Sequence, residues 1–207
     1  MDKLRPQINS ATPCKTQNQI QCFQINLQHS RAATYNLIKV IETEEPDLIF
    51  VQEPYEYQNR PVGIEKKNRI FTAGNGKHRA AIVIPNNKID AILITNLSNE
   101  DTVILEITHG NLTFFAASMY FDYYDQIGNN FTKIDALLRL AKGRKILIAA
   151  DTNSRSTTWH DITTNSRGKK LEEYLANKQL HIINEESESF TFHNSIHHKQ
   201  QLTGSHK

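Results

Sequence analysis

The fold of this chain is decided by a short stretch, DLIFVQE at residues 47–53. Leu48–Val51 is an uninterrupted apolar run bounded by polar residues, which is typical of a short buried strand. The run is followed directly by Gln52 and by the carboxylate of Glu53. A polar side chain at the end of such a strand can be held rigidly at the rim of a sheet, where pockets open. The stretch therefore predicts both a sheet and a candidate site at its edge.

The residues upstream of this strand predict a second strand and a helix. Ile20–Leu27 alternates polar and apolar side chains, as a strand with one buried face does. Ala32–Glu45 has apolar residues at helical spacing, with Ser30 as the expected N-cap, and Pro46 ends the helix. The order strand, helix, strand points to an α/β protein.

Strand and helix patterns continue downstream, with turn residues such as Asn86-Asn87 between them. The expected strands are Ala80–Pro85, Ile89–Ile94, Val103–Thr108, Leu112–Tyr120, Arg144–Asp151 and Leu180–Asn184. Helical spacing predicts helices over Asn130–Lys142 and Lys169–Asn177. Because several strand pairs are joined by short turns, we expect an α/β fold of the layered sandwich type. Its two mixed, largely antiparallel sheets are flanked by helices.

Length and composition suit a single folded domain. The chain has 207 residues, of which 38% are hydrophobic and 22% charged. The net charge of +2 excludes neither nucleic acid nor a small phosphate ester as a partner. Cys14 and Cys22 lack zinc-site spacing, which favours a reducing compartment. Residues 1–18 are expected to be a disordered leader, not a signal peptide, and no run is apolar enough to cross a bilayer. We therefore expect an intracellular protein without membrane contact.

Polar residues also end two further apolar strands, at Gln24–Asn26 and Ala149–Asn153. If the fold brings these ends to Glu53, then Asn26, Glu53, Asp151 and Asn153 form a set of hard oxygen ligands. Such a set suits Mg²⁺ or Mn²⁺ better than zinc. Each residue taken alone is more often the start of a solvated loop, so the prediction depends on the combination.

The motifs occur in a fixed order, Gln24–Gln28, Asp47–Pro54, Ala116–Tyr120 and Ala150–Ser154. This order resembles the metal-dependent endonuclease/exonuclease/phosphatase superfamily, which includes DNase I and the apurinic/apyrimidinic endonucleases. Longer stretches are similar to the endonuclease domains of insect-type non-LTR retrotransposons, namely Asn26–Thr34, Gln52–Tyr55 and Asn153–Trp159. The resemblance implies a domain over residues 19–193.

The resemblance implies a site that cleaves phosphodiester bonds in double-stranded DNA with Mg²⁺ or Mn²⁺ as cofactor. It implies Glu53 as the principal metal ligand, with Asn26 beside it. It also implies that Asp151 orients or deprotonates the attacking water, and that Asn153 and Tyr120 contact the phosphate. From the residues alone, Tyr120 could equally be an ordinary strand aromatic and Asn26 a turn former.

Basic and aromatic residues near these motifs are candidates for DNA contact. Arg31 and Arg155 could bind phosphates, as could Lys77–Arg79, while Tyr123 and Trp159 could stack on bases or wedge between them. For Arg155 and Lys77–Arg79 the alternative is an ordinary solvated loop, and Arg31 could merely cap the helix.

The sequence departs from the superfamily pattern after residue 193. Complete members carry a Ser/Thr-x-x-Asp segment and a final Asp-His pair, and residues 194–207 contain neither. We therefore expect a fold that is incomplete at the C-terminus, with 194–207 as a tail unlike the family. The expected function is that of a retrotransposon DNA-nicking endonuclease, impaired in this chain and nuclear if functional. Two alternatives stay open: a non-catalytic remnant that binds DNA or metal, and a phosphatase of the same superfamily.

Overall fold

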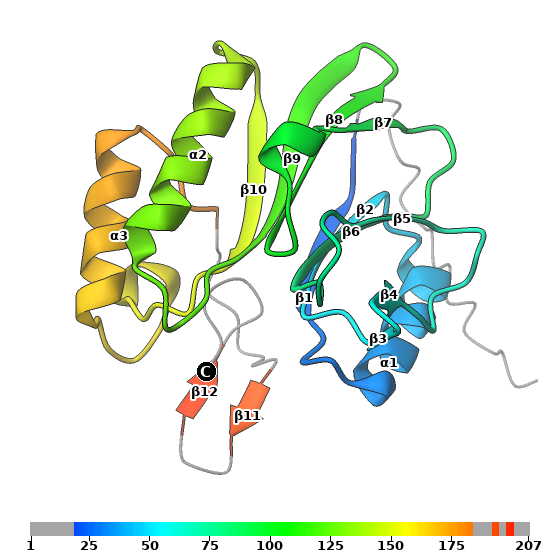
Figure 1. Ribbon diagram of the computed structural model, residues 1–207, viewed down its shortest axis with the longest axis horizontal. Coiled ribbons are helices and arrows are strands. Elements are labelled where there is room, and N and C mark those ends of the chain that lie inside the picture. The colour runs from blue at the N-terminus through cyan, green and yellow to red at the C-terminus, as the bar shows by residue number, and fades with distance from the viewer. Residues whose placement is uncertain (1–18, 184–191, 195–197, 201–207) are drawn as a thin grey trace, which may run out of the picture.

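The computed structural model describes residues 19–183, 192–194 and 198–200. Two four-stranded sheets face each other, with one helix on the outside of the first sheet and two on the outside of the second (Figure 1). This is the layered α/β-sandwich that the sequence predicts. Two short hairpins, β3 (Glu56–Tyr57) with β4 (Arg60–Pro61) and β11 (Phe192–Asn194) with β12 (His198–Gln200), lie outside the two sheets.

The first sheet has the strand order β1-β2-β6-β5. Its strands are β1 (Cys22–Asn26), β2 (Leu48–Gln52), β6 (Ala80–Ile84) and β5 (Arg69–Phe71). β1 and β2 are parallel because helix α1 (Arg31–Glu44) crosses between them, whereas the other pairs are antiparallel. The side chain of Ser30 accepts a hydrogen bond from the amide of Ala33, so the predicted N-cap is confirmed.

The second sheet repeats this arrangement with the order β10-β9-β8-β7. Its strands are β7 (Asp90–Leu93), β8 (Thr102–His109), β9 (Leu112–Tyr120) and β10 (Ile146–Asp151). Helix α2 (Ile127–Ala141) makes the crossover between the parallel strands β9 and β10, and the other two pairs are antiparallel. Helix α3 (Ser166–Asn177) lies beside α2. The short 3-10 helices η1 (Thr95–Leu97) and η2 (Thr157–Trp159) lie in connecting loops.

Side-chain alternation along the central strands builds three apolar layers. Leu48 and Phe50 of β2 point between the sheets, while Ile49 and Val51 point to α1. The same division occurs in β8, where Leu105 packs between the sheets and Ile104 packs toward α2 and α3. Because both faces of these strands are buried, their sequences are nearly continuous apolar runs. The two sheets are therefore fixed against each other by a dry core.

One predicted element is not found where the sequence placed it. Leu180–Ile183 is not a strand in the described residues, and Ile183 is 72% exposed. Leu180 instead packs against the cluster that lies beneath α2 and α3. An apolar pattern without a neighbouring strand to complete its hydrogen bonds does not form a sheet.

The expected leader (1–18) and much of the expected tail (194–207) lie outside the described residues, as does the question of an incomplete C-terminal end. Among the residues described, the structure has no helix that combines the length and the apolar character needed to span a bilayer.

Candidate active site

The four candidate residues at strand ends meet at one end of the sandwich. Asn26 ends β1, Tyr120 ends β9 and Asp151 ends β10, while Glu53 directly follows β2. The carboxyl ends of parallel strands lie at the same edge of a sheet, which brings Asn26 near Glu53 and Tyr120 near Asp151. The side-chain nitrogen of Asn26 donates a hydrogen bond of 2.7 Å to Oδ2 of Asp151 and so joins the two sheets.

Glu53 is held in an unusual backbone conformation. Its φ of 47° is in the left-handed region, which costs a residue other than glycine on the order of 1 kcal/mol. Two backbone hydrogen bonds keep it there: its amide donates to the carbonyl of Arg79 (2.9 Å), and its carbonyl accepts from the amide of His29 (2.8 Å). Glu53 is only 7% exposed. A strained, largely buried carboxylate at a strand end is typical of a functional position.

His29 lies beside this carboxylate. Its Nδ1 is 2.8 Å from the carbonyl oxygen of Pro54, so Nδ1 carries the proton and donates. Its Nε2 is 3.9 Å from Oε1 of Glu53. The ring orientation is therefore set by the backbone, and one imidazole nitrogen faces the candidate site.

Asp151 and Asn153 form a buried pair on the second sheet. Asp151 has no exposed surface, and its Oδ1 accepts a hydrogen bond of 3.2 Å from the amide of Asn153. The side-chain nitrogen of Asn153 donates to the carbonyl of Phe121 at 3.0 Å. Its Oδ1 is buried and has no hydrogen-bond partner among the described residues. A buried acceptor without a donor is costly, and such groups are commonly completed by water or an ion.

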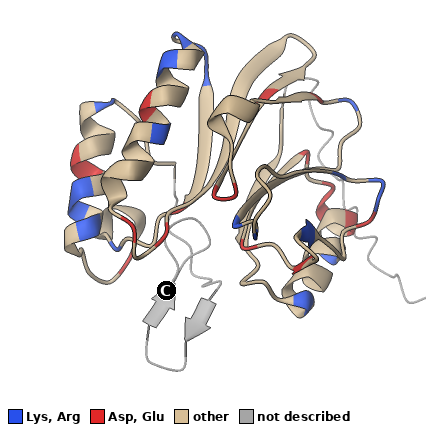
Figure 2. Cartoon of the chain, in the orientation of Figure 1, with Lys and Arg blue, Asp and Glu red and all other residues tan. Residues whose placement is uncertain are grey.

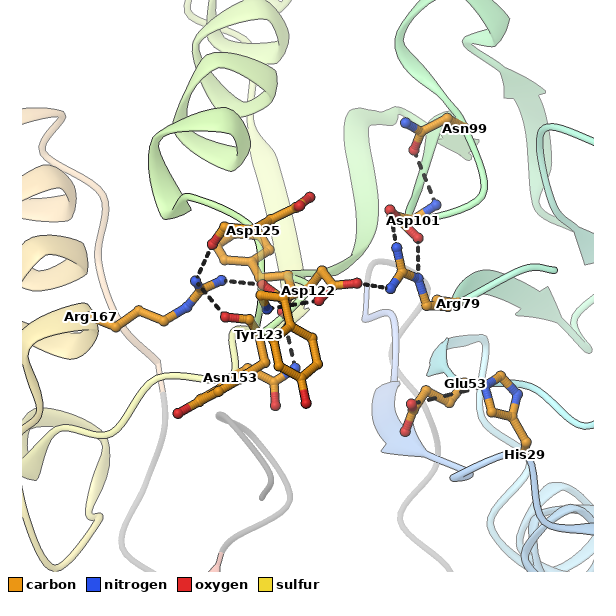
Figure 3. A network of polar contacts seen from close by, with 12 residues as sticks. His29, Glu53, Arg79, Asn99, Asp101, Asp122, Tyr123, Asp125, Asn153 and Arg167 are labelled. Atoms are coloured by element: carbon orange, nitrogen blue, oxygen red, sulfur yellow. Dashed lines mark hydrogen bonds and ion pairs between the residues drawn. The ribbon is translucent and has the colours of Figure 1, made fainter. Parts of the chain in front are cut away.

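Tyr120 packs beneath the guanidinium of Arg79, which is 5.0 Å from the ring centroid. Arg79 also makes a two-pronged ion pair with Asp101, at 2.6 and 2.7 Å, and a further ion pair with Asp122. The hydrogen bonds to Asp101, and then to Asp122, raise the pKa of Arg79. Figure 3 shows Arg79 reaching Asp101 on one side and Asp122 on the other. Arg79 therefore links the start of β6 to loops of the second sheet.

Gln52, the residue before Glu53, joins the two sheets through buried hydrogen bonds. Its side-chain nitrogen donates to Oγ of Ser118 across the sheets (3.0 Å), and its Oε1 accepts from the side chain of Gln24 (3.2 Å). Ser118 in turn donates to the carbonyl of Val51 (3.1 Å). Gln52 and Ser118 have no exposed surface, so this network fixes the register of the two sheets directly under Glu53.

The residues expected to contact DNA fall into different environments. Tyr123 is 61% exposed and lies in the loop that follows β9. Arg31 is exposed at the first residue of α1, and Arg155 is partly buried beside the N-terminus of α3. Trp159, in contrast, is 7% exposed: its ring packs near Leu171, and its Nε1 donates to the carbonyl of Ser154 at 3.1 Å. The expectation of a surface tryptophan is corrected, because η2 turns the ring inward against α3.

The basic triplet Lys77–Arg79 is also not an open cationic surface. Lys77 lines the groove beside Glu53, but His78 is buried with its Nδ1 2.5 Å from Oε1 of Glu56, and Arg79 is paired as described. Each of the three helices carries acidic as well as basic residues (Figure 2).

The donor set fits a hard divalent cation. A groove of about 920 Å³ lies beside Glu53 and Tyr120 and is lined by further carboxylates of Glu100, Asp101 and Asp122. The described residues contain no group of three or more His, Cys, Asp and Glu side chains arranged to hold a metal. Magnesium commonly takes only one or two carboxylates and keeps several waters, so a site anchored by the carboxylate of Glu53 and completed by water is compatible with it. The unpartnered Oδ1 of Asn153 agrees with this interpretation.

The ion pairs of Arg79 with Asp101 and Asp122 were not predicted from the sequence. Arg79 was interpreted as a possible phosphate contact, because its position in a basic triplet is visible locally. Its carboxylate partners lie 22 and 43 residues away, and no sequence spacing indicates them.

Comparison with known proteins gives consistent results. A family model described as "Endonuclease-reverse transcriptase" matches residues 114–201. A 115 kDa protein of the type-1 retrotransposable element R1DM of Drosophila melanogaster is 24% identical over 180 residues. That alignment covers 83% of this chain but only 17% of the relative, so the chain spans about a sixth of that protein.

Solved structures show the same fold. The endonuclease domain of TRAS1, a telomere-specific non-LTR retrotransposon, matches with a TM-score of 0.78 and 24% identity, covering 88% of this chain and 82% of that domain. An endonuclease/exonuclease/phosphatase family protein from Bacteroides thetaiotaomicron matches with a TM-score of 0.50 and 11% identity, covering 74% and 68%. The expected layered architecture is therefore confirmed by relatives of known structure.

Proposed function

We propose that this chain, which is similar to retrotransposon endonuclease domains and has the fold of the endonuclease/exonuclease/phosphatase superfamily, is a metal-dependent phosphodiesterase that nicks double-stranded DNA. Its action on DNA would take place in the nucleus. Mg²⁺ is the proposed cofactor, and Mn²⁺ its substitute.

The observation that carries the proposal is the hydrogen bond from Asn26 to Asp151 across the two sheets. It brings together the strand ends that bear Asn26, Glu53, Tyr120 and Asp151, on elements separated by as much as 125 residues. Buried amides and carboxylates have little structural use at the rim of an apolar core, because each costs desolvation free energy. Their convergence supports a site that handles a cation and a phosphate.

Glu53, Asn26 and Oδ1 of Asn153 are the residues that would hold the metal. The metal, when bound, supplies positive charge that polarises the phosphate. Tyr120, whose ring lies against the guanidinium of Arg79, would donate a hydrogen bond from its hydroxyl to a phosphate oxygen. His29 presents Nε2 toward Glu53 and can accept a hydrogen bond from a water there.

We assign Asp151 a positioning role, not direct contact with the attacking water. Its carboxylate is fully buried and accepts hydrogen bonds from the Asn26 side chain and the Asn153 amide. The first bond orients the side-chain amide of Asn26 and the second fixes the backbone at Asn153, in the manner of outer carboxylates at metal sites. Loss of Asp151 would therefore act through misplacement of Asn26 and Asn153.

We further propose that this 207-residue chain nicks DNA slowly. Residues 194–207 contain no Asp-His pair. An acid–base group typically contributes about 10²- to 10⁴-fold to a rate, so chemistry without it is correspondingly weaker.

The proposal is tested by nicking of supercoiled plasmid in Mg²⁺, in Mn²⁺ and in EDTA, over long incubations and at high enzyme concentration. We expect weak nicking that requires the metal and is lost in Glu53→Gln. Glu42→Gln is the matched control, because Glu42 is exposed on α1 and lies outside the proposed site. Nicking of equal rate in Glu53→Gln would overturn the assignment of the site.

The same preparations separate the alternatives. Release of phosphate from small monoesters without any nicking of DNA would favour a phosphatase. Absence of both activities, together with unchanged metal binding in Glu53→Gln, would favour a non-catalytic remnant.

A further inference from the structure

Two tyrosines stand out from the surface next to the candidate site. Tyr123 is 61% exposed and Tyr124 is 92% exposed, although both line the groove that contains Glu53 and Tyr120. Their ring centroids are 5.4 Å apart with an interplanar angle of 89°. Exposure of two adjacent aromatic side chains has an unfavourable hydration free energy, which contact with a flat apolar partner would recover.

The loop that carries these tyrosines is fixed by Arg167, from the first turn of α3. The guanidinium of Arg167 donates to the carbonyls of Asp122 (2.8 Å) and Asp125 (2.6 Å), and its Nε donates to that of Thr152 (3.4 Å). Burial lowers the pKa of Arg167, which is consistent with a guanidinium used as an internal clamp. Figure 3 shows Arg167 and Arg79 approaching this loop from opposite sides.

Asp122 holds the same loop through contacts on its other side. Its Oδ1 accepts a hydrogen bond of 2.9 Å from the amide of Tyr124, and its Oδ2 pairs with Arg79. The loop backbone is therefore held by hydrogen bonds from both sides, whereas the rings of Tyr123 and Tyr124 remain mostly exposed to solvent. A rigid backbone reduces the entropy lost when a ring binds a partner, which favours use of these rings for recognition.

The other strongly exposed tyrosines have a different setting. Tyr35 lies on the outer face of α1 with the ammonium of Lys39 4.8 Å from its ring, and Tyr57 lies in the β3–β4 hairpin. Neither of them lines the groove beside Glu53. Tyr123 and Tyr124 are thus distinguished by their place and by their fixed support, not by exposure alone.

We propose that Tyr123 and Tyr124 form a stacking platform for a nucleobase that has left the DNA stack next to the bond to be cut. This inference rests on the proposed function and adds the form of DNA that is recognised. Stacking on aromatic rings is tolerant of sequence, because every base has a flat face. The chain should therefore prefer DNA with a bulged or mismatched base, or a flexible pyrimidine–purine step, over a stiff paired duplex.

The test measures binding in EDTA, so that neither metal nor cleavage contributes. A duplex with one bulged 2-aminopurine is titrated with protein, and a fully paired duplex of the same sequence serves as reference. We expect tighter binding of the bulged duplex and quenching of the 2-aminopurine fluorescence. Tyr123→Ala and Tyr124→Ala should each weaken binding of the bulged duplex by about five-fold or more, while Tyr→Phe at either position retains it.

Tyr35→Ala and Tyr57→Ala are the matched controls and should bind like the wild type. Equal affinity of the Tyr123→Ala, Tyr124→Ala double variant and the wild type for the bulged duplex would overturn the platform. That result would leave the proposed nuclease intact, since metal-dependent nicking is measured separately. A wild type that binds neither duplex would count against both proposals.

Discussion

The side-chain nitrogen of Asn26 lies 2.7 Å from Oδ2 of Asp151, so a residue that ends the first strand of one sheet is bonded to a residue that ends a strand of the other. Asn26 also accepts a hydrogen bond of 2.7 Å from the amide of Gln28, which fixes the orientation of its amide group. The candidate site is therefore built on a contact between two rigid sheets, and its geometry depends on their packing.

Replacement of Asn26 by Asp should destabilise the fold in a manner that depends on pH. Two carboxylates at this distance repel each other, which raises the pKa of the pair in the folded state. Stability of the variant should therefore be lowest at neutral pH, by about 2 kcal/mol or more, and should recover as the pH falls through the raised pKa. Urea unfolding at pH 7.5 and pH 5 measures this difference. Asn87→Asp, in an exposed turn, is the control, and equal losses at both pH values would contradict the contact.

The contacts of Asp122 with the amide of Tyr124 and with Arg79 should stabilise the protein less in acid. The amide of Tyr124, and then Arg79, lower the pKa of Asp122 below its usual value of 3.8. A carboxyl group with a depressed folded pKa stabilises the protein above its usual pKa, and that contribution is lost as the pH falls through the lower folded value. Asp122→Asn should therefore reduce the unfolding free energy by about 1 kcal/mol at pH 7 and by much less near pH 3. A difference in unfolding free energy between the wild type and Asp122→Asn that grows on acidification would contradict this role of the Asp122 carboxylate.

Gly168 should not tolerate a side chain. A Cβ at this position would lie 1.8 Å from the carbonyl oxygen of Arg155, a backbone atom that cannot move aside without displacing the loop after β10. Gly168→Ala should lower the unfolding free energy by about 2 kcal/mol or more, since overpacked sites must shift backbone. Gly128→Ala is the matched control: nothing lies within 4 Å of its Cβ, and alanine is the better helix former, so its effect should be neutral or stabilising. Similar melting temperatures for the two variants would refute the close approach of Arg155 and α3.

Local patterns predicted the site better than its surroundings. The strands that place Asn26, Glu53 and Asp151 at or directly after their ends were predicted because a buried strand is visible as an apolar run, and the carboxyl ends of parallel strands must share an edge. The N-cap Ser30 was predicted for the same reason, as its partner lies three residues away. These features depend on residues that are close in sequence.

Long-range contacts account for most of what the sequence did not reveal. Trp159 follows a polar segment and was expected at the surface, but a turn of η2 packs it against α3. Helix α3 begins at Ser166, not at Lys169, because Asn165 caps it by accepting from the amide of Gly168 (2.7 Å). Leu180–Ile183 has the composition of a strand, but the described residues provide no partner strand for it. For Trp159 and for Leu180–Ile183 the deciding contacts involve other elements, whereas the Asn165 cap is a local signal that the sequence prediction missed.

The most direct test of the account is metal binding at Glu53. Titration of Mn²⁺, followed by electron paramagnetic resonance or calorimetry, does not depend on catalytic activity. We expect one weak site in the wild type and in Glu42→Gln, because Glu53 provides charge and the neighbouring groups are mainly amides. We expect loss of that site in Glu53→Gln with the fold retained, as judged by circular dichroism. Equal Mn²⁺ binding by Glu53→Gln and the wild type would contradict the central claim that Glu53 anchors the metal.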